Sequence, residues 1–144
     1  MDSFKIVAFK LGEEEYGLNI KLVQSIERIQ QITRVPNAPN YVKGVINLRG
    51  NVTPVIDLRS KLNFEPAVFT SDTRIIITKN GDIELGYIVD QTKDVLNVNT
   101  YDIESASTIR TNSEFFKGIA KINGRLIILL NLDELMKQQT SKVE

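Results

Sequence analysis

Residues 44–62 read GVINLRGNVTPVIDLRSKL, and residues 118–136 read GIAKINGRLIILLNLDELM. The two stretches align without a gap at an offset of 74 residues, so that Gly44 falls on Gly118 and Gly50 falls on Gly124. In each stretch a turn that contains glycine separates two short apolar runs. This pattern predicts a β-hairpin in which the turn glycine supplies a positive φ. Each hairpin is followed by a short helix.

An earlier pair of segments repeats at an offset of 69 residues, which places Gly12 on Gly81 and Gly17 on Gly86. Because the later offset is larger, the second copy carries five additional residues. They fall within the polar stretch 97–117, which we interpret as a surface excursion. One unit of secondary structure therefore occurs twice. We expect a mainly β fold of two small strand barrels, related by an approximate two-fold axis, with a groove where they meet.

The expected domain organisation follows from this duplication. We take 1–144 as one domain with two subdomains, roughly 13–72 and roughly 73–136, and expect a flexible tail at 137–144. Whether the N-terminal strand is shared between the subdomains stays open. Since neither copy is large enough to bury a comfortable core alone, each should bury apolar surface against the other.

The remaining elements are short. Residues 21–29 fit either a short helix or a twisted strand, and the pattern does not separate the two. Two prolines make 33–41 an extended loop. Pro54 lies inside an expected strand, which implies an edge or a bulge. Asp57 and Asn131 are placed to cap the two short helices.

Composition excludes several classes of function. The 144 residues include no cysteine and no histidine, and 18 basic residues balance 18 acidic ones. Thiolate and imidazole metal sites and nucleophile pairs that depend on histidine are therefore absent. A chain with no excess positive charge is poorly suited to the phosphate backbone of a nucleic acid. No stretch approaches the length of a membrane-spanning helix.

Carboxylates leave one catalytic possibility, which the sequence does not favour. Glu13–Glu15 form the only tight acidic cluster, and we interpret them as a solvated turn. Asp90 and Asp94 follow an apolar strand and are more typical of salt-bridge or capping residues. No phosphate-binding loop and no calcium loop is present. A hydrolase that depends on carboxylates stays open as a disfavoured alternative.

Two features of the surface suggest binding. Arg49 occupies the hairpin position that Asn123 takes in the second copy. It is either an exposed arginine that happens to differ or a residue that binds a carboxylate on another protein. The apolar residues Val23, Ile26 and Val95 are either ordinary core or part of a hydrophobic groove that accepts a helix.

Several motifs resemble the CheW family of bacterial chemotaxis coupling proteins. The segments that carry the resemblance are YVKGVINLRG at 41–50, PVIDLR at 54–59, EYG at 15–17 and RVP at 34–36 followed by Pro39. The similarity extends from about Phe4 to Met136. It implies two intertwined five-stranded SH3-like barrels with short helices, in agreement with the duplication.

The resemblance also implies a function. Members of the family are non-enzymatic adaptors without a cofactor. They link the cytoplasmic tip of transmembrane chemoreceptors to the histidine kinase CheA, through the kinase's own CheW-like regulatory domain. The receptor tip is a helical hairpin that docks between the two barrels. We therefore expect a cytoplasmic protein recruited to membrane receptor arrays, with no membrane insertion and no nucleic-acid partner.

Carried over position by position, the resemblance implies a set of protein-binding residues. They are Val23, Ile26, Lys43, Gly44, Asn47, Arg49, Gly86, Asp90 and Val95. One departure affects the set, because the family often has glutamate where this chain has Ser25, and here the nearest glutamate is Glu27. The alternative function is a small β-barrel module that binds nucleic acid or another protein outside chemotaxis.

Overall fold

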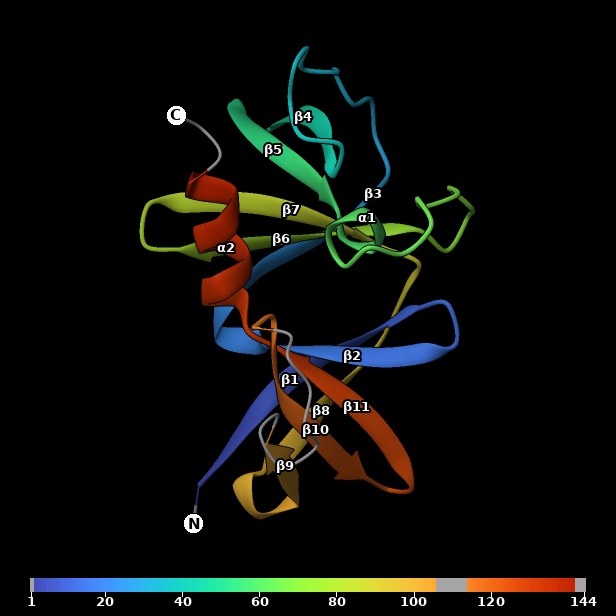
Figure 1. Cartoon of the computed structure of the whole chain (residues 1–144), viewed down its shortest axis with the longest axis vertical. Coiled ribbons are helices and arrows are strands. Elements are labelled where there is room, and N and C mark those ends of the chain that lie inside the picture. Colours follow the sequence, from blue (N-terminus) through green and yellow to red (C-terminus); the bar gives the residue numbers. More distant parts are fainter. Residues whose placement is uncertain (1, 106–113, 142–144) are drawn as a thin grey trace. The chain divides into compact units, whose positions relative to one another are not determined.

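The computed structural model describes residues 2–105 and 114–141, with the backbone alone for 137–141 (Figure 1). The chain forms two compact units. Unit 1 consists of Met1–Lys21 and Lys93–Glu144, and unit 2 is Leu22–Thr92. The elements, in chain order, are β1 (Ser3–Leu11), β2 (Glu14–Asn19), η1 (Ile20–Leu22), β3 (Val23–Arg28), β4 (Val42–Leu48), β5 (Asn51–Asp57), α1 (Leu58–Lys61), β6 (Arg74–Asn80), β7 (Ile83–Val89), β8 (Gln91–Asn99), η2 (Thr100–Asp102), β9 (Ile103–Ser105), β10 (Phe116–Ile122), β11 (Arg125–Leu130) and α2 (Leu132–Ser141).

Unit 2 contains a five-stranded sheet in the order β3-β6-β7-β5-β4. All neighbours are antiparallel except β5 and β7, which run parallel. The edge strands are β3 and β4, yet Arg49 in the turn after β4 reaches Glu27 on β3, with 3.4 Å between Nη2 and Oε2. The sheet therefore curls so that its two edges approach, as in a barrel.

One core cluster of unit 2 consists mostly of β-branched residues. Alternation along a strand places every second side chain on one face, which explains why Ile75 and Ile77 of β6 enter the same cluster. Its buried members are Ile46, Leu48, Val55, Ile75, Ile77 and Ile88. Branched side chains of this kind fit a pleated surface well, and they position the hairpin β4–β5 that is considered below.

Unit 1 contains a six-stranded sheet in the order β8-β1-β2-β11-β10-β9. Its core comprises Ile6, Val98, Ala120, Ile127 and Leu129. A parallel pair again joins the two hairpins, since β2 runs parallel to β11. The registers of the two parallel pairs are equivalent: Gly17 faces Leu129 in unit 1, and Gly86 faces Val55 in unit 2.

These pairings place the unit boundaries away from the expected ones. Unit 1 combines the first hairpin of the first copy with the second hairpin of the second copy, and unit 2 combines the other two hairpins. The chain therefore divides at residues 22 and 92 rather than between 72 and 73. The expected mainly β, SH3-like fold with intertwined halves is confirmed, and the short strand β9 makes the sheet of unit 1 six-stranded instead of five-stranded.

Three local expectations also change. The ambiguous segment 21–29 is a 3-10 turn followed by strand β3, with a bulge between Val23 and Ser25. The polar stretch 97–117 contains the end of β8 and all of β9, while 106–113 lie outside the described residues. Residues 137–141, expected to belong to a flexible tail, continue helix α2 to Ser141, and 142–144 lie outside the described residues.

The pairing of β4 with β5 contains a bulge between Val42 and Gly44, next to the position that faces Pro54. Pro54 itself lies in an interior strand rather than at an edge. The residue of β4 that faces Pro54 is Val45. The N–H and the C=O of Val45 both form hydrogen bonds with Thr33, each of 2.8 Å. Val45 therefore makes no bond to Pro54, and the missing N–H of the proline faces away from β4. Pairing with β7 begins only at Val55, so no ladder bond is lost at Pro54.

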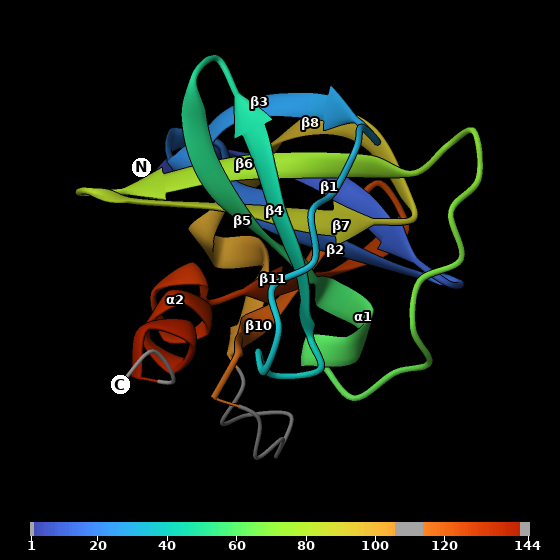
Figure 2. The same ribbon diagram turned by 90° about the horizontal axis from the view of Figure 1, so that it is seen from above.

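A long loop, residues 63–72, connects α1 to β6 within unit 2, and Figure 2 shows it as the extended green trace between those elements. Asp57, buried at the end of β5, binds both the start of α1 and the middle of this loop. Its carboxylate accepts hydrogen bonds from the N–H of Arg59 at 3.1 Å and from the N–H of Ala67 at 2.9 Å. The expected capping role of Asp57 is confirmed. None of the helices in the described ranges has the length and apolar character needed to cross a bilayer.

Candidate protein-binding surfaces

The turn between β4 and β5 presents Arg49. Leu48 pairs with Asn51, and the two residues between them, Arg49 and Gly50, have φ values of 53° and 86°. Two consecutive left-handed residues define the tight hairpin turn that suits the twist of its strands. The Asn47 Oδ1 accepts a hydrogen bond from the Gly50 N–H at 3.0 Å, which holds the turn in place. The Arg49 side chain is 65% exposed.

The equivalent turn of unit 1 has Asn123 at φ 51° and Gly124 at φ 78°. The hairpin geometry therefore requires a left-handed φ at position 49 as well as at Gly50. Asparagine tolerates the left-handed region far better than arginine does. Arg49 accordingly occupies a backbone conformation that is unfavourable for its type, while its side chain extends into solvent. Local strain of this kind at an exposed residue suggests a functional role.

The ion pair of Arg49 with Glu27 leaves much of the guanidinium available. It consists of one contact at 3.4 Å, and the guanidinium has five N–H donors in all. Exposed pairs of this geometry contribute only about 0–1 kcal/mol. A carboxylate from another protein could therefore engage the guanidinium at little expense to the fold.

Strand β3 carries Val23 and Ile26. Its residues alternate between half-buried and exposed, which leaves Val23 partly covered and Ile26 43% exposed. Ser25, which follows the bulge in β3, has a buried hydroxyl with no hydrogen-bond partner among the described residues. Val95 is 52% exposed and belongs to β8 in unit 1. The groove between the barrels stays a prediction.

Two of the expected binding residues are glycines with structural roles. Gly44 is buried, and a Cβ there would lie 2.1 Å from the Thr33 carbonyl oxygen. Gly86 is buried too, and a Cβ there would lie 2.8 Å from Ile75 Cγ2. Neither presents a side chain to a partner. Each allows the close approach of a neighbouring segment, and a substitution would act first on the fold.

Asp90 and Asp94 both form ion pairs, as the sequence suggested. Asp90 is held by Arg59 through both carboxylate oxygens, with 2.8 Å between Arg59 Nε and Oδ1. Asp94 lies in unit 1, where Arg125 donates to its carboxylate at 3.0 and 3.1 Å and also donates to Glu15. The hydrogen bonds from Arg125 hold the pKa values of both carboxyl groups below their ordinary range, more strongly than partial burial raises them.

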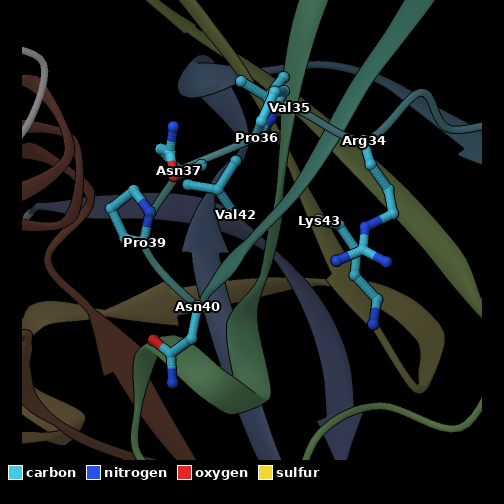
Figure 3. A pocket seen from close by; sticks show the side chains of 9 residues that line it. Arg34, Val35, Pro36, Asn37, Pro39, Asn40, Val42 and Lys43 are labelled. Carbon is cyan, nitrogen blue, oxygen red and sulfur yellow. The ribbon is translucent and has the colours of Figure 1, made fainter.

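A further surface was not singled out from the sequence. A cavity of about 580 Å³ lies between the loop 34–40 and the start of β4, and an adjoining one of about 390 Å³ extends to Phe69. Arg34, Asn40, Val42 and Lys43 line both (Figure 3). The available signal was the spacing of two cations around a loop with two prolines. Elsewhere in the part of the chain that the structure describes, no cluster of acidic residues could hold a metal ion.

Comparison with known proteins identifies the family. The family model described as "CheW-like domain" matches residues 5–140. The chain belongs to the CheW family. It is 40% identical to the chemotaxis protein CheW of Bacillus subtilis over an alignment of 140 residues. The alignment covers 96% of this chain and 90% of the relative. It is 35% identical over 135 residues to CheW of Helicobacter pylori, covering 93% and 82%.

A solved structure of this family has the same fold. The crystal structure of scaffolding protein TtCheW from Thermoanaerobacter tengcongensis matches with a TM-score of 0.84 and 36% identity over 90% of each chain. The SH3-like architecture of CheW proteins is therefore that of this chain. Membership also places the chain in chemotaxis, among scaffold and adaptor proteins.

Proposed function

We propose that this chain is a cytoplasmic adaptor without catalytic activity that binds both the tip of transmembrane chemoreceptors and the histidine kinase CheA in membrane receptor arrays. The observation that carries the proposal is the exposure of the Arg49 guanidinium on a strained turn. A 65% exposed guanidinium is maintained on a left-handed turn where the second copy has asparagine. The relatives named CheW support the choice of chemotaxis.

Arg49 is suited to protein recognition. A planar guanidinium engages a carboxylate through two parallel hydrogen bonds, and arginine is frequent among residues that dominate binding energy. Because the turn is fixed by the bond between Asn47 and Gly50, little backbone freedom is lost when a partner binds. The regulatory CheW-like domain of the kinase is a natural source of that carboxylate.

The receptor tip requires a different kind of surface. A helical hairpin buries an apolar face, and Ile26 and Val95 are apolar residues that remain 43% and 52% exposed. We propose that each contributes apolar surface that contacts the receptor. An adaptor that binds both partners can transmit a signal if its contacts with the kinase differ between two receptor states.

The experiment measures binding of the full chain to a receptor tip fragment and, separately, to the regulatory domain of the kinase. Arg49→Ala should weaken binding to at least one partner by about 1–3 kcal/mol, or roughly 5- to 150-fold. Lys79→Ala removes an exposed cation from another hairpin of unit 2 and should change neither affinity. Equal affinities for Arg49→Ala and the unmodified chain would refute the role of Arg49. Failure of the unmodified chain to bind either partner would refute the function.

A further inference from the structure

The cavities beside the loop 34–40 form a surface with a definite chemistry, which we call the Arg34–Lys43 cavity. It is defined by the residues common to both hollows, Arg34, Asn40, Val42 and Lys43, together with Phe69 at one rim. Figure 3 shows the side chains of Arg34 and Lys43 next to each other beside β4. All five residues belong to unit 2.

The charge of this cavity is positive and unbalanced. Neither Arg34 nor Lys43 has a carboxylate partner within the described residues, and no acidic residue lines either hollow. By contrast, Arg49, Arg59 and Arg125 each pair with a carboxylate of this chain. Two like charges that share a hollow repel each other, and a bound anion relieves the repulsion. The cavity therefore favours a negatively charged ligand.

The cavity also offers apolar surface and an amide. The Lys43 ammonium lies 5.8 Å from the centroid of the Phe69 ring, and Phe69 remains 42% exposed. Val42 is half-buried beside them. The Asn40 side chain is exposed and can both donate to and accept from a peptide backbone. Cations, an exposed aromatic ring and an amide together suit an acidic peptide better than a small inorganic anion.

The walls of the cavity are held in place before any ligand binds. Pro36 and Pro39 restrict the loop, and Asn37 at φ 63° completes its turn. Two hydrogen bonds of 2.8 Å join Thr33 to Val45 at one end, and the Val42 N–H bonds to the Pro39 carbonyl at 3.0 Å at the other. A preformed site loses little conformational entropy on binding.

We propose that the Arg34–Lys43 cavity docks an extended acidic segment of a partner protein, in which carboxylates engage Arg34 and Lys43 and an apolar residue between them contacts Phe69. Lys43 and Arg49 are six residues apart along β4 and its turn, which corresponds to about 20 Å at the rise of a β-strand. The cavity is thus a second docking surface beside the Arg49 hairpin. It depends on the proposed function only in that an adaptor has protein partners.

The test is an NMR titration of the full chain with a capped nine-residue peptide of alternating glutamate and leucine. A peptide with glutamine in place of glutamate serves as the control ligand. We expect amide shifts at Asn40, Lys43 and Phe69 with the acidic peptide and at least tenfold weaker binding of the glutamine peptide. Equal binding of the two peptides, or shifts confined to other residues, would overturn the proposal.

Matched variants separate this site from general charge effects. The double variant Arg34→Gln/Lys43→Gln should bind the acidic peptide at least tenfold more weakly than the unmodified chain. Lys43→Arg keeps the charge, and its affinity for the peptide should lie within about threefold of that of the unmodified chain. Lys79→Gln with Lys117→Gln makes the same charge change, and Lys117 stands at the repeat position equivalent to Lys43. The affinity of this control variant for the acidic peptide should lie within about twofold of that of the unmodified chain. Loss of affinity in both double variants to the same degree would contradict a specific site.

Two other occupants are distinguished in the same series. Inorganic phosphate at matched concentration should produce smaller shifts, and equal shifts would mean that the cavity binds small anions only. Concentration-dependent sedimentation that disappears in the Arg34→Gln/Lys43→Gln variant would instead identify a second copy of this chain as the occupant. Arg49→Ala should bind the peptide normally, so that failure of the proposed adaptor role and failure of this site give different results.

Discussion

At the scale of single residues, Arg49 combines an unfavourable backbone with an exposed functional group. Replacing Arg49 by Asn should relieve the left-handed strain and raise the free energy of unfolding by about 0.5 kcal/mol, after the weak pair with Glu27 is lost. The same variant should lose affinity for at least one of the two partners. Chemical denaturation and binding measurements on one preparation check both effects.

The second copy supplies the reverse exchange. Asn123→Arg places arginine in the equivalent turn of unit 1, at φ 51°, and should lower the free energy of unfolding by about 0.5–1 kcal/mol without changing partner binding. If Arg49→Asn is less stable than the unmodified chain, the turn does not impose the strain inferred here. Sequence alone could not show this strain, because glycine at the next position satisfied the visible turn signal.

Arg125 gives unit 1 a dependence on pH. Its hydrogen bonds lower the folded-state pKa values of Glu15 and Asp94, so the carboxylates stabilise the fold above their ordinary pKa values of about 4.3 and 3.9. That contribution is lost as the pH falls through the lowered values. Arg125→Gln should therefore cost about 1 kcal/mol at pH 7, since the pairs are partly exposed, and progressively less below about pH 4.

Denaturation of the unmodified chain and of Arg125→Gln between pH 7 and pH 3 checks this pH dependence. The curves of unfolding free energy against pH should converge on the acidic side. Curves that remain parallel over the whole range would show that Arg125 acts through packing alone. Salt-bridge or capping roles for Asp90 and Asp94 were anticipated from their place after an apolar strand. The partners Arg59 and Arg125 were not, because each lies 31 residues away along the chain from the carboxylate it binds.

At the scale of elements, Asp57 connects strand β5, helix α1 and the loop that carries Phe69. Asp57→Ala would leave the partly buried N–H groups of Arg59 and Ala67 without their acceptor. We expect a loss of about 2–3 kcal/mol of unfolding free energy, from a lost cap and unsatisfied donors. Hydrogen exchange at 67–72 should accelerate beyond what the overall loss explains.

Asn131→Ala is the matched change in the second copy. Asn131 accepts one longer hydrogen bond, 3.3 Å from the Glu134 N–H, so its removal should cost about 1 kcal/mol. Equal losses in the two variants would mean that Asp57 does no more than cap its helix. The comparison thus isolates the contribution of the bond to Ala67.

The elements that sequence predicted well are the hairpins, because a glycine turn between two apolar runs leaves few alternatives. Residues 21–29 were ambiguous because β3 is an edge strand with a bulge, and its half-exposed pattern differs little from that of a short helix. The expectation of an edge strand at Pro54 was wrong for a related reason. Its missing N–H is harmless where pairing with β7 has not yet begun, and this depends on a register that no local pattern reveals.

At the scale of the whole molecule, the sequence indicated the duplication but not how the halves pair. Both copies contain the same two hairpins, so pairing within a copy and exchange between copies fit the pattern equally well. The registers decide it, since Gly17 faces Leu129 and Gly86 faces Val55. Similarly, Arg34 and Phe69 lie 35 residues apart in sequence and meet only in the folded unit, so the spacing of Arg34 and Lys43 around the proline loop could not indicate the whole cavity.

Two fragments of nearly equal length distinguish these pairings. Residues 22–92 contain all strands of unit 2, whereas residues 1–72 contain the first copy with one hairpin from each unit. Fragment 22–92 should show β-type circular dichroism and cooperative unfolding, although with less stability than the whole chain, because domains of about 70 residues are marginal. Fragment 1–72 should show neither. Cooperative unfolding of 1–72 would mean that a copy, rather than a unit, is the folding entity.

The discontinuous path of unit 1 affects how the protein is made. Strands β1 and β2 leave the ribosome before unit 2, but their neighbours β8 and β11 follow it in the chain. Unit 2, being continuous, can complete its sheet while synthesis proceeds. The opening hairpin must meanwhile wait with both edges unpaired, and such edges invite association with other nascent chains. Slow translation beyond residue 92 would lengthen that wait and penalise the yield of folded protein.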